Sequence, residues 1–136
     1  MLKKTETKEE KLKKTAEKLG VDLILLFGSR VDGSSRQDSD FDIAYRSKSS
    51  LKSDLDLFNP LMDYLGSDNL HIVNLKGIKP LFLYEIMNNC KVLYAKNMMD
   101  FYNLRVYAFR RFHDEAKPLY EMIFEKFKKE YLYDNK

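Results

Sequence analysis

Two carboxylates near the middle of the chain have the spacing that metal chemistry needs. Asp40 and Asp42 are two residues apart at the start of an apolar stretch, Phe41 to Tyr45, that predicts a strand. Residues two apart on a strand leave the same face, so both carboxylates point one way while Phe41 and Ile43 point into the core. Carboxylates held side by side repel each other unless a cation lies between them. Because hard oxygen ligands suit Mg²⁺ or Mn²⁺, the pair predicts a divalent metal site.

A glycine and a serine upstream add groups that can bind phosphate. Gly28 and Ser29 follow the apolar run Val21 to Phe27, which predicts a buried strand. Backbone N–H groups at such a turn and the Ser29 hydroxyl can hold a phosphate, and Gly28 lets the phosphate approach the backbone closely. Arg30 and Arg36 can add charge-assisted hydrogen bonds to phosphate oxygens. We therefore expect a metal–nucleotide site whose chemistry is in-line attack on phosphorus.

Together these residues resemble the signature of a known superfamily. Gly28-Ser29, ten further residues and then Asp40-x-Asp42 form the pattern G-S-x10-D-x-D of the DNA polymerase β-like nucleotidyltransferases. Within that superfamily, the short length and the continuation of the chain to about residue 96 resemble the minimal nucleotidyltransferases (MNT). The resemblance implies the fold of the superfamily, a small mixed β-sheet packed with helices.

The small members share a longer form of the signature, G-S-R-x-x-G-…-S-D-x-D, which Gly33 and Ser39 match here. The resemblance implies ATP or another nucleoside triphosphate as the substrate and Mg²⁺ (or Mn²⁺) as the cofactor. The reaction is then transfer of a nucleoside monophosphate to an acceptor, with release of pyrophosphate. On this resemblance the nucleotide contacts Gly28, Ser29, Arg30, Gly33 and Ser39, and the catalytic metal ligands are Asp40 and Asp42.

The resemblance also implies a protein partner. Many minimal members are encoded beside a HEPN-domain protein, typically a ribonuclease toxin, and they act as its antitoxin. Some of them do so by adding AMP groups to a tyrosine of the toxin. A chain of this kind is therefore expected to be a protein adenylyltransferase that forms a hetero-oligomer with its partner or a homo-oligomer.

One residue departs from the family pattern. Active members usually carry a third acidic residue on the next strand, and the apolar run Leu70 to Leu75, which predicts that strand, has His71 there. We expect His71 to be the third catalytic residue, because imidazole can act as a base or ligate Mn²⁺ or Zn²⁺. Asp68 is close enough in sequence to replace it if the register differs.

Two other functions stay open. Imidazole binds Mg²⁺ poorly, so the alternative is a nucleotide-binding antitoxin of weak or no activity that neutralises its partner by direct binding. A third hypothesis, modification of a small molecule such as an aminoglycoside, requires a larger acceptor domain than this chain provides, or a dimer.

Hydrophobic spacing predicts the elements that position these residues. Helical spacing recurs within residues 1–20, where Gly20 can end the helix, and from Leu51 to Leu65, where Pro60 predicts a kink or a broken start. Pro80 suits the first turn of a further helix that runs to about Asn88. Residues 28–39 are expected to form a loop or a short irregular helix, and Val92 to Ala95 a short edge strand. The order is that of an α/β (α+β) domain, with helices packed on a small sheet.

The C-terminal part, Met98 to Tyr133, is helical in pattern, and Pro118 is expected to divide it into two segments. We expect one domain over residues 1–136, with a core at about 20–96 and a helical extension over 97–136. The aromatic side chains of this extension exceed what one buried face needs, which indicates a protein interface. An RNA surface is less favoured, because acidic residues lie between the basic ones.

Composition agrees with one such domain. The chain has 136 residues, of which 44% are hydrophobic and 33% charged, enough for both a core and a polar surface. The net charge of +3 is too small to indicate nucleic-acid binding. No apolar run is long enough to span a membrane, and the single Cys90 suits a reducing compartment, so we expect a cytoplasmic protein.

Overall fold

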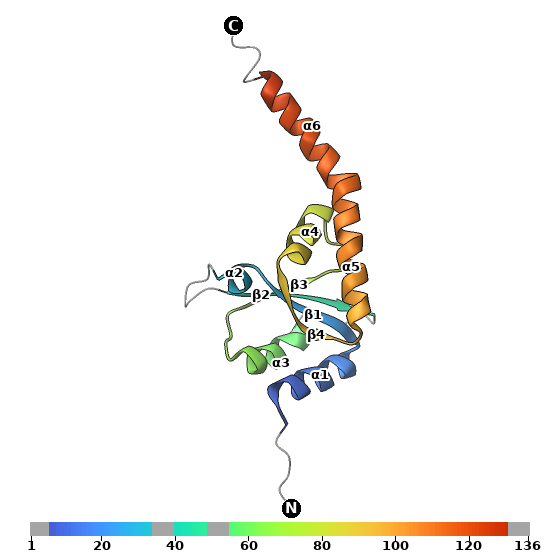
Figure 1. Cartoon of the computed structure of the whole chain (residues 1–136). Coiled ribbons are helices and arrows are strands. Elements are labelled where there is room, and N and C mark those ends of the chain that lie inside the picture. The colour runs from blue at the N-terminus through green and yellow to red at the C-terminus, as the bar shows by residue number, and fades with distance from the viewer. Residues whose placement is uncertain (1–5, 34–39, 49–54, 131–136) are drawn as a thin grey trace, which may run out of the picture.

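The elements alternate along the chain in the computed structural model, which describes residues 6–33, 40–48 and 55–130. In chain order they are α1 (Lys8–Leu19), β1 (Val21–Phe27), α2 (Ser29–Asp32), β2 (Phe41–Ser47), α3 (Leu55–Leu65), β3 (Leu70–Asn74), α4 (Pro80–Asn88), β4 (Cys90–Ala95), α5 (Met98–Arg111), the π-helical segment η1 (Phe112–Ala116) and α6 (Lys117–Lys128) (Figure 1). This order confirms the expected mixed α/β class. The region from α1 to α5 is called the sheet body below, and η1 with α6 the helical arm.

The four strands form one mixed sheet in the order β3-β2-β1-β4. β1 is antiparallel to both β2 and β4, whereas β2 and β3 run parallel. β1 is buried along its whole length, as expected for an inner strand that is covered on both faces. β4 is an edge strand, as the sequence predicts, and begins two residues earlier than Val92.

Helices cover both faces of the sheet. Leu12 and Ala16 of α1 and Leu57 and Leu61 of α3 pack with one set of strand residues, which includes Ile43. α4 and α5 pack on the opposite face, where Leu83, Ile86, Met87, Phe101 and Ala108 meet Leu25, Phe27 and Ala44. Because side chains alternate along a strand, Asp42, which precedes Ile43 by one residue, lies on the α4–α5 face.

Local signals in the sequence set the ends of the helices. Thr7 accepts a hydrogen bond from the N–H of Glu10 at the start of α1, and Gly20 ends that helix with a left-handed φ of 75°. α3 runs through Pro60 from Leu55 to Leu65, so the described part of this helix has no break there. No helix in the described ranges is long and apolar enough to span a membrane.

The division expected at Pro118 takes the form of a wider helical turn rather than a break. The chain stays helical from Met98 to Lys128, and the N–H of Lys117 donates to the carbonyl of Phe112 at the end of the π-helical segment. Proline has no N–H to donate and its ring crowds the carbonyl four residues earlier, so an expanded turn just before it relieves the contact. Figure 1 shows α6 extending from this turn away from the sheet.

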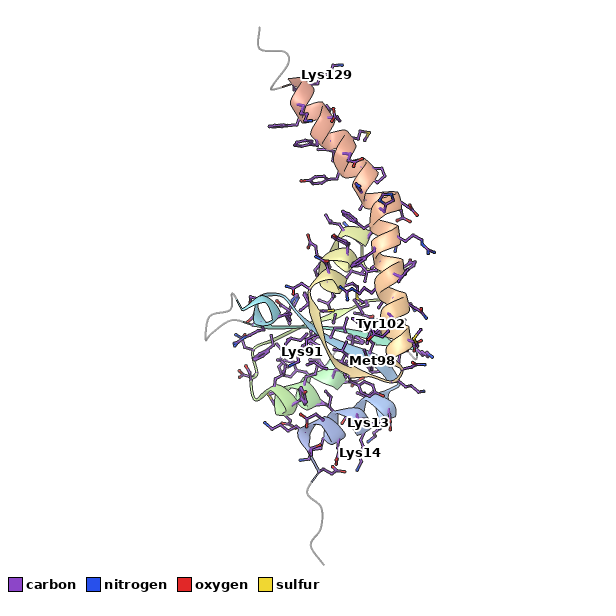
Figure 2. All side chains as sticks on the ribbon, in the orientation of Figure 1. Lys13, Lys14, Lys91, Met98, Tyr102 and Lys129 are labelled. Carbon is purple, nitrogen blue, oxygen red and sulfur yellow. The ribbon has the colours of Figure 1, made fainter. Side chains whose placement is uncertain are left out.

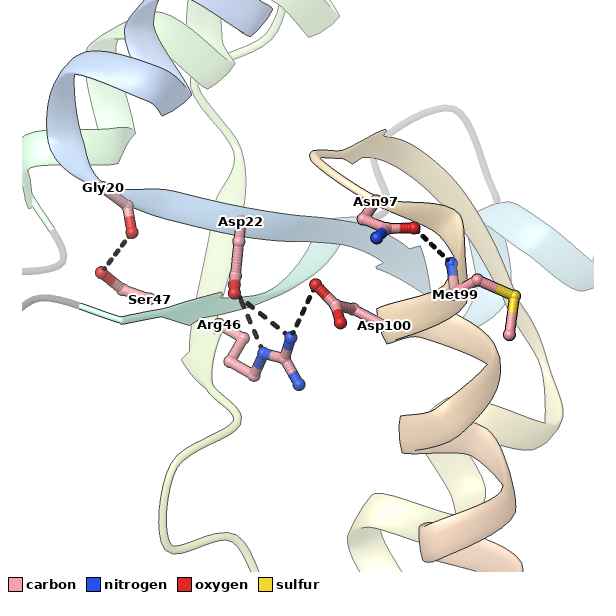
Figure 3. Close-up of polar contacts among 7 residues, drawn as sticks. All are labelled: Gly20, Asp22, Arg46, Ser47, Asn97, Met99 and Asp100. Atoms are coloured by element: carbon pink, nitrogen blue, oxygen red, sulfur yellow. Dashed lines mark hydrogen bonds and ion pairs between the residues drawn. The ribbon is translucent and has the colours of Figure 1, made fainter.

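A buried acid links the start of the sheet to α5. Asp22, 2% exposed, accepts hydrogen bonds from Nε and Nη2 of Arg46 at 3.3 and 3.2 Å, and Arg46 also lies 3.6 Å from Asp100 of α5 (Figure 3). A buried carboxylate needs such a partner, because it has lost its contact with water. The triad therefore fixes α5 against β1 and β2, at the end of β2 that lies away from Asp42.

Candidate active site

The turn after β1 and the start of β2 meet at one point, because Phe27 pairs with Asp42 in the antiparallel register. Gly28 follows with φ 78° and ψ −155°, a conformation that residues with a side chain rarely adopt. A methyl group at Gly28 would also overlap Oδ2 of Asp42. The glycine is therefore needed twice, for its backbone angle and for the room that the carboxylate occupies.

His71 lies on the other side of the same carboxylate. The parallel register of β2 and β3 pairs Asp42 with His71, and Nδ1 of His71 is 3.4 Å from Oδ1 of Asp42. The His71 side chain is 63% exposed and that of Asp42 28%, so both can be reached from solvent. Asp68 is exposed in the turn before β3. Because the register pairs Asp42 with His71, His71 and not Asp68 lies beside Asp42.

Asp40 directly precedes β2 and is exposed. Within the described ranges, no three His, Cys, Asp or Glu side chains come close enough together to hold a metal ion by themselves. The donor set nevertheless fits a divalent cation bound together with a substrate, since Mg²⁺ in proteins commonly has one or two carboxylate ligands and completes its shell with phosphate oxygens and water. Asp42 is the carboxylate best placed for this, because it lies against the glycine turn.

The residues expected at the phosphates surround the short helix α2. Ser29 is its first residue and is half-buried, and the exposed Gly33 ends it with φ 80°. The guanidinium of Arg30 lies 4.2 Å from the centre of the Phe41 ring, a cation–π contact that holds it beside the start of β2. Arg36 and Ser39 lie outside the described residues.

The sequence model of the family described as "Polymerase beta, Nucleotidyltransferase" matches residues 10–99, from α1 to the start of α5. The chain belongs to this nucleotidyltransferase family. The resemblance based on the glycine–serine turn and the paired aspartates is thereby confirmed. No curated protein shows a significant match to the chain.

Solved structures of similar fold include several toxin–antitoxin complexes. A chain of a toxin–antitoxin complex with AMP-PNP matches with a TM-score of 0.69 at 22% identity, over 88% of this nucleotidyltransferase and 98% of that chain. A chain of an MntA–HepT toxin–antitoxin complex gives 0.63 at 21% identity, over 88% and 97%. A chain of a tri-AMPylated Shewanella oneidensis HEPN toxin in complex with its MNT antitoxin gives 0.62 at 20% identity, over 88% and 96%. These likenesses establish the fold of the chain.

Two features of the nucleotidyltransferase site are not evident from the sequence. The glycine at position 28 does more than let phosphate approach, because its missing side chain also makes room for Asp42. Phe41 is more than a core residue, because the guanidinium of Arg30 packs on its ring. The alternation of Phe41 with two aspartates placed its ring on the opposite face, but no local signal indicates which side chain covers that ring.

Proposed function

We propose that the chain transfers AMP from ATP to a hydroxyl group of a partner protein, a tyrosine of a HEPN-type toxin, and acts as the antitoxin. The observation that carries the proposal is the contact of Asp42 with Gly28 on one side and His71 on the other, in a chain of nucleotidyltransferase ancestry. The similar structures include a toxin–antitoxin complex with AMP-PNP and an AMPylated HEPN toxin in complex with an MNT antitoxin, and these support the choice of nucleotide and acceptor.

Each site residue has a proposed role. The backbone at Gly28 and the hydroxyl of Ser29 hold phosphate oxygens, and Arg30, Gly33 and Ser39 are the further residues that we assign to nucleotide binding. Asp40, Asp42 and His71 form the catalytic side, and the two carboxylates hold Mg²⁺ or Mn²⁺. The cation, when bound, neutralises charge on the phosphate oxygens.

The reaction itself is an in-line displacement at the α-phosphorus. The tyrosine oxygen forms a bond to the α-phosphorus, the bond from that phosphorus to the bridging oxygen breaks, and pyrophosphate leaves. The hydroxyl proton is released to solvent. Positioning of the reacting groups supplies much of the rate enhancement in such transfers. The fold therefore contributes chiefly by holding Asp42 in place beside the nucleotide.

The proposal is tested by intact-mass analysis of the purified chain with the protein encoded beside it, ATP and Mg²⁺, then Mn²⁺. We expect the mass of one or more AMP groups to be added to the partner. Asp42→Asn, which keeps the size of the side chain, should abolish the addition, whereas the control Asp63→Asn, an exposed position on α3, should not. Equal transfer by the Asp42→Asn variant would contradict the proposal.

A second function, neutralisation by contact alone, is favoured by the surface of the helical arm. Five side chains of α6 form an apolar stripe and are 50–67% exposed, namely Leu119, Tyr120, Ile123, Phe124 and Phe127. A groove of about 440 Å³ between the stripe and the start of α4 is lined by Leu81, Leu119 and Ile123 among others. Figure 2 shows the side chains of α6 projecting from a helix that extends away from the sheet, and no residue of α6 is buried among the described residues.

Such a stripe suits an apolar helical surface on the proposed protein partner, because contiguous exposed apolar side chains commonly mark a protein interface. Ile123→Asp combined with Phe127→Asp should then abolish complex formation, whereas Glu121→Lys on the polar side of α6 should not. If Asp42→Asn still neutralises the toxin and the double variant does not, contact is the function. If only Asp42→Asn fails, transfer is the function.

A further inference from the structure

His71 and Asp42 face each other at a distance close to the separation of two ligands of one cation. Their facing atoms, Nδ1 and Oδ1, are 3.4 Å apart, which is longer than the usual N–H···O hydrogen bond of about 2.9 Å. Two neighbouring ligands of an octahedral ion with bonds of about 2.1 Å are separated by roughly 3 Å. A small shift of either side chain would therefore let both atoms bind one ion.

The two side chains are also held in place by the sheet and open on their other sides. Asp42 and His71 are directly paired residues of β2 and β3, so the backbone hydrogen bonds of the sheet fix their separation. The His71 side chain is 63% exposed, which leaves room for phosphate oxygens and water. Since no third His, Cys, Asp or Glu of the described ranges lies close to them, phosphate oxygens and water, together with the exposed Asp40 once the ion draws it in, complete the shell.

We propose that His71 is a metal ligand together with Asp42, and that this nitrogen–oxygen pair makes the site prefer a first-row transition cation over Mg²⁺. The proposal rests on the proposed function, because it concerns the cation that accompanies the nucleotide. Imidazole is a good ligand for such cations and a poor one for Mg²⁺, and unlike a carboxylate it brings no negative charge. A histidine at this position therefore lowers the affinity for Mg²⁺ more than the affinity for Mn²⁺.

A direct test is pulsed electron paramagnetic resonance of Mn²⁺ bound to the untagged, full-length chain with a non-hydrolysable ATP analogue. The protein is labelled with ¹⁵N and the analogue is left unlabelled, so a nitrogen of the protein is distinguished from one of adenine. We expect a ¹⁵N coupling to Mn²⁺ that is lost in His71→Ala. The control His113→Ala, which removes the other histidine, an exposed residue of η1, should keep it.

A titration gives the second readout. Replacement of His71 by aspartate, His71→Asp, supplies a third carboxylate, so the ratio of the Mn²⁺ affinity to the Mg²⁺ affinity should fall by about tenfold. The His113→Ala control should leave that ratio unchanged.

The outcomes separate this proposal from the proposed function. Binding of Mn²⁺ and nucleotide without a coupling to protein nitrogen, or no Mn²⁺ binding at all, would overturn the role of His71 as a ligand. The mass assay for AMP transfer with Mg²⁺ tests the proposed function separately, whatever the outcome of the Mn²⁺ experiment. A ¹⁵N coupling without any AMP transfer would support His71 as a metal ligand and contradict the proposed transferase activity.

Discussion

The sheet body and the helical arm contain similar apolar side chains but use them differently. In the sheet body, residues such as Leu57 and Ile43 are fully buried between the sheet and its helices. In the helical arm no residue of η1 or α6 is buried, although α6 has as clear an apolar stripe as α1. The sheet body therefore completes its own core and holds the strands that position Asp42. Among the described residues, the helical arm leaves its apolar stripe exposed to solvent.

The comparison is tested most strongly by truncating one apolar side chain in each region. Leu57→Ala should lower the free energy of unfolding by about 2–5 kcal/mol, because it leaves a cavity in a closed core. Ile123→Ala, at a side chain that is 59% exposed, should change it by less than about 0.5 kcal/mol. Chemical denaturation of both variants measures the difference, and similar losses would show that the arm is packed in solution.

The next test asks whether the sheet body is rigid at the site. Gly66→Ala puts a side chain at a positive φ and should cost about 1 kcal/mol of stability, whereas Gly28→Ala, at φ 78° and ψ −155°, should cost more, up to about 3 kcal/mol. Only Gly28→Ala adds a methyl group against Asp42, since the space around Gly66 is open. We expect Gly28→Ala alone to weaken binding of Mg²⁺·ATP, by about tenfold or more, as measured by calorimetry. Equal affinities would mean that the carboxylate moves aside freely.

A third comparison concerns ion pairs. Arg46→Met leaves the buried Asp22 without the guanidinium that donates to it and should lower the free energy of unfolding by about 3 kcal/mol. Arg111→Met removes an exposed pair with Glu115 on the surface of the helices and should have no measurable effect on the unfolding midpoint. Thermal unfolding at two salt concentrations checks both, and a large loss at Arg111 would reveal packing around the arm.

The smallest expected effect is a difference in thiol reactivity. Burial raises the pKa of the Cys90 thiol, although the charge of Arg105 opposes this slightly. In the folded chain the thiol therefore stays protonated to a higher pH than in the unfolded chain. As the pH rises from the ordinary thiol pKa through the raised one, the free energy of unfolding falls. Alkylation at pH 8 should be slower at Cys90 than at a thiol introduced in α6 by Glu121→Cys in a Cys90→Ala background. Equal rates would contradict the partial burial of Cys90.

Much of the fold follows from the sequence, because apolar periodicity, Gly20 and Pro80 fix where most elements begin and end. Those signals are local, so they predicted each strand and the order of elements. The contact between Gly28 and Asp42 is different, because it depends on the register of two strands that local spacing leaves undetermined. The position of His71 beside Asp42 was available only through the resemblance to the family.

The π-helical turn has a consequence for the direction in which the helical arm faces. An expanded turn inserts about one extra residue, and each residue of a helix advances the surface by about 100°. The face of α5 that contains Phe101 and Ala108 packs on the sheet body, and that face does not continue in phase into α6. The rotation instead turns Leu119 and Ile123 toward the start of α4, where they line the groove. Deleting one residue of η1 would therefore redirect the apolar stripe without changing its composition.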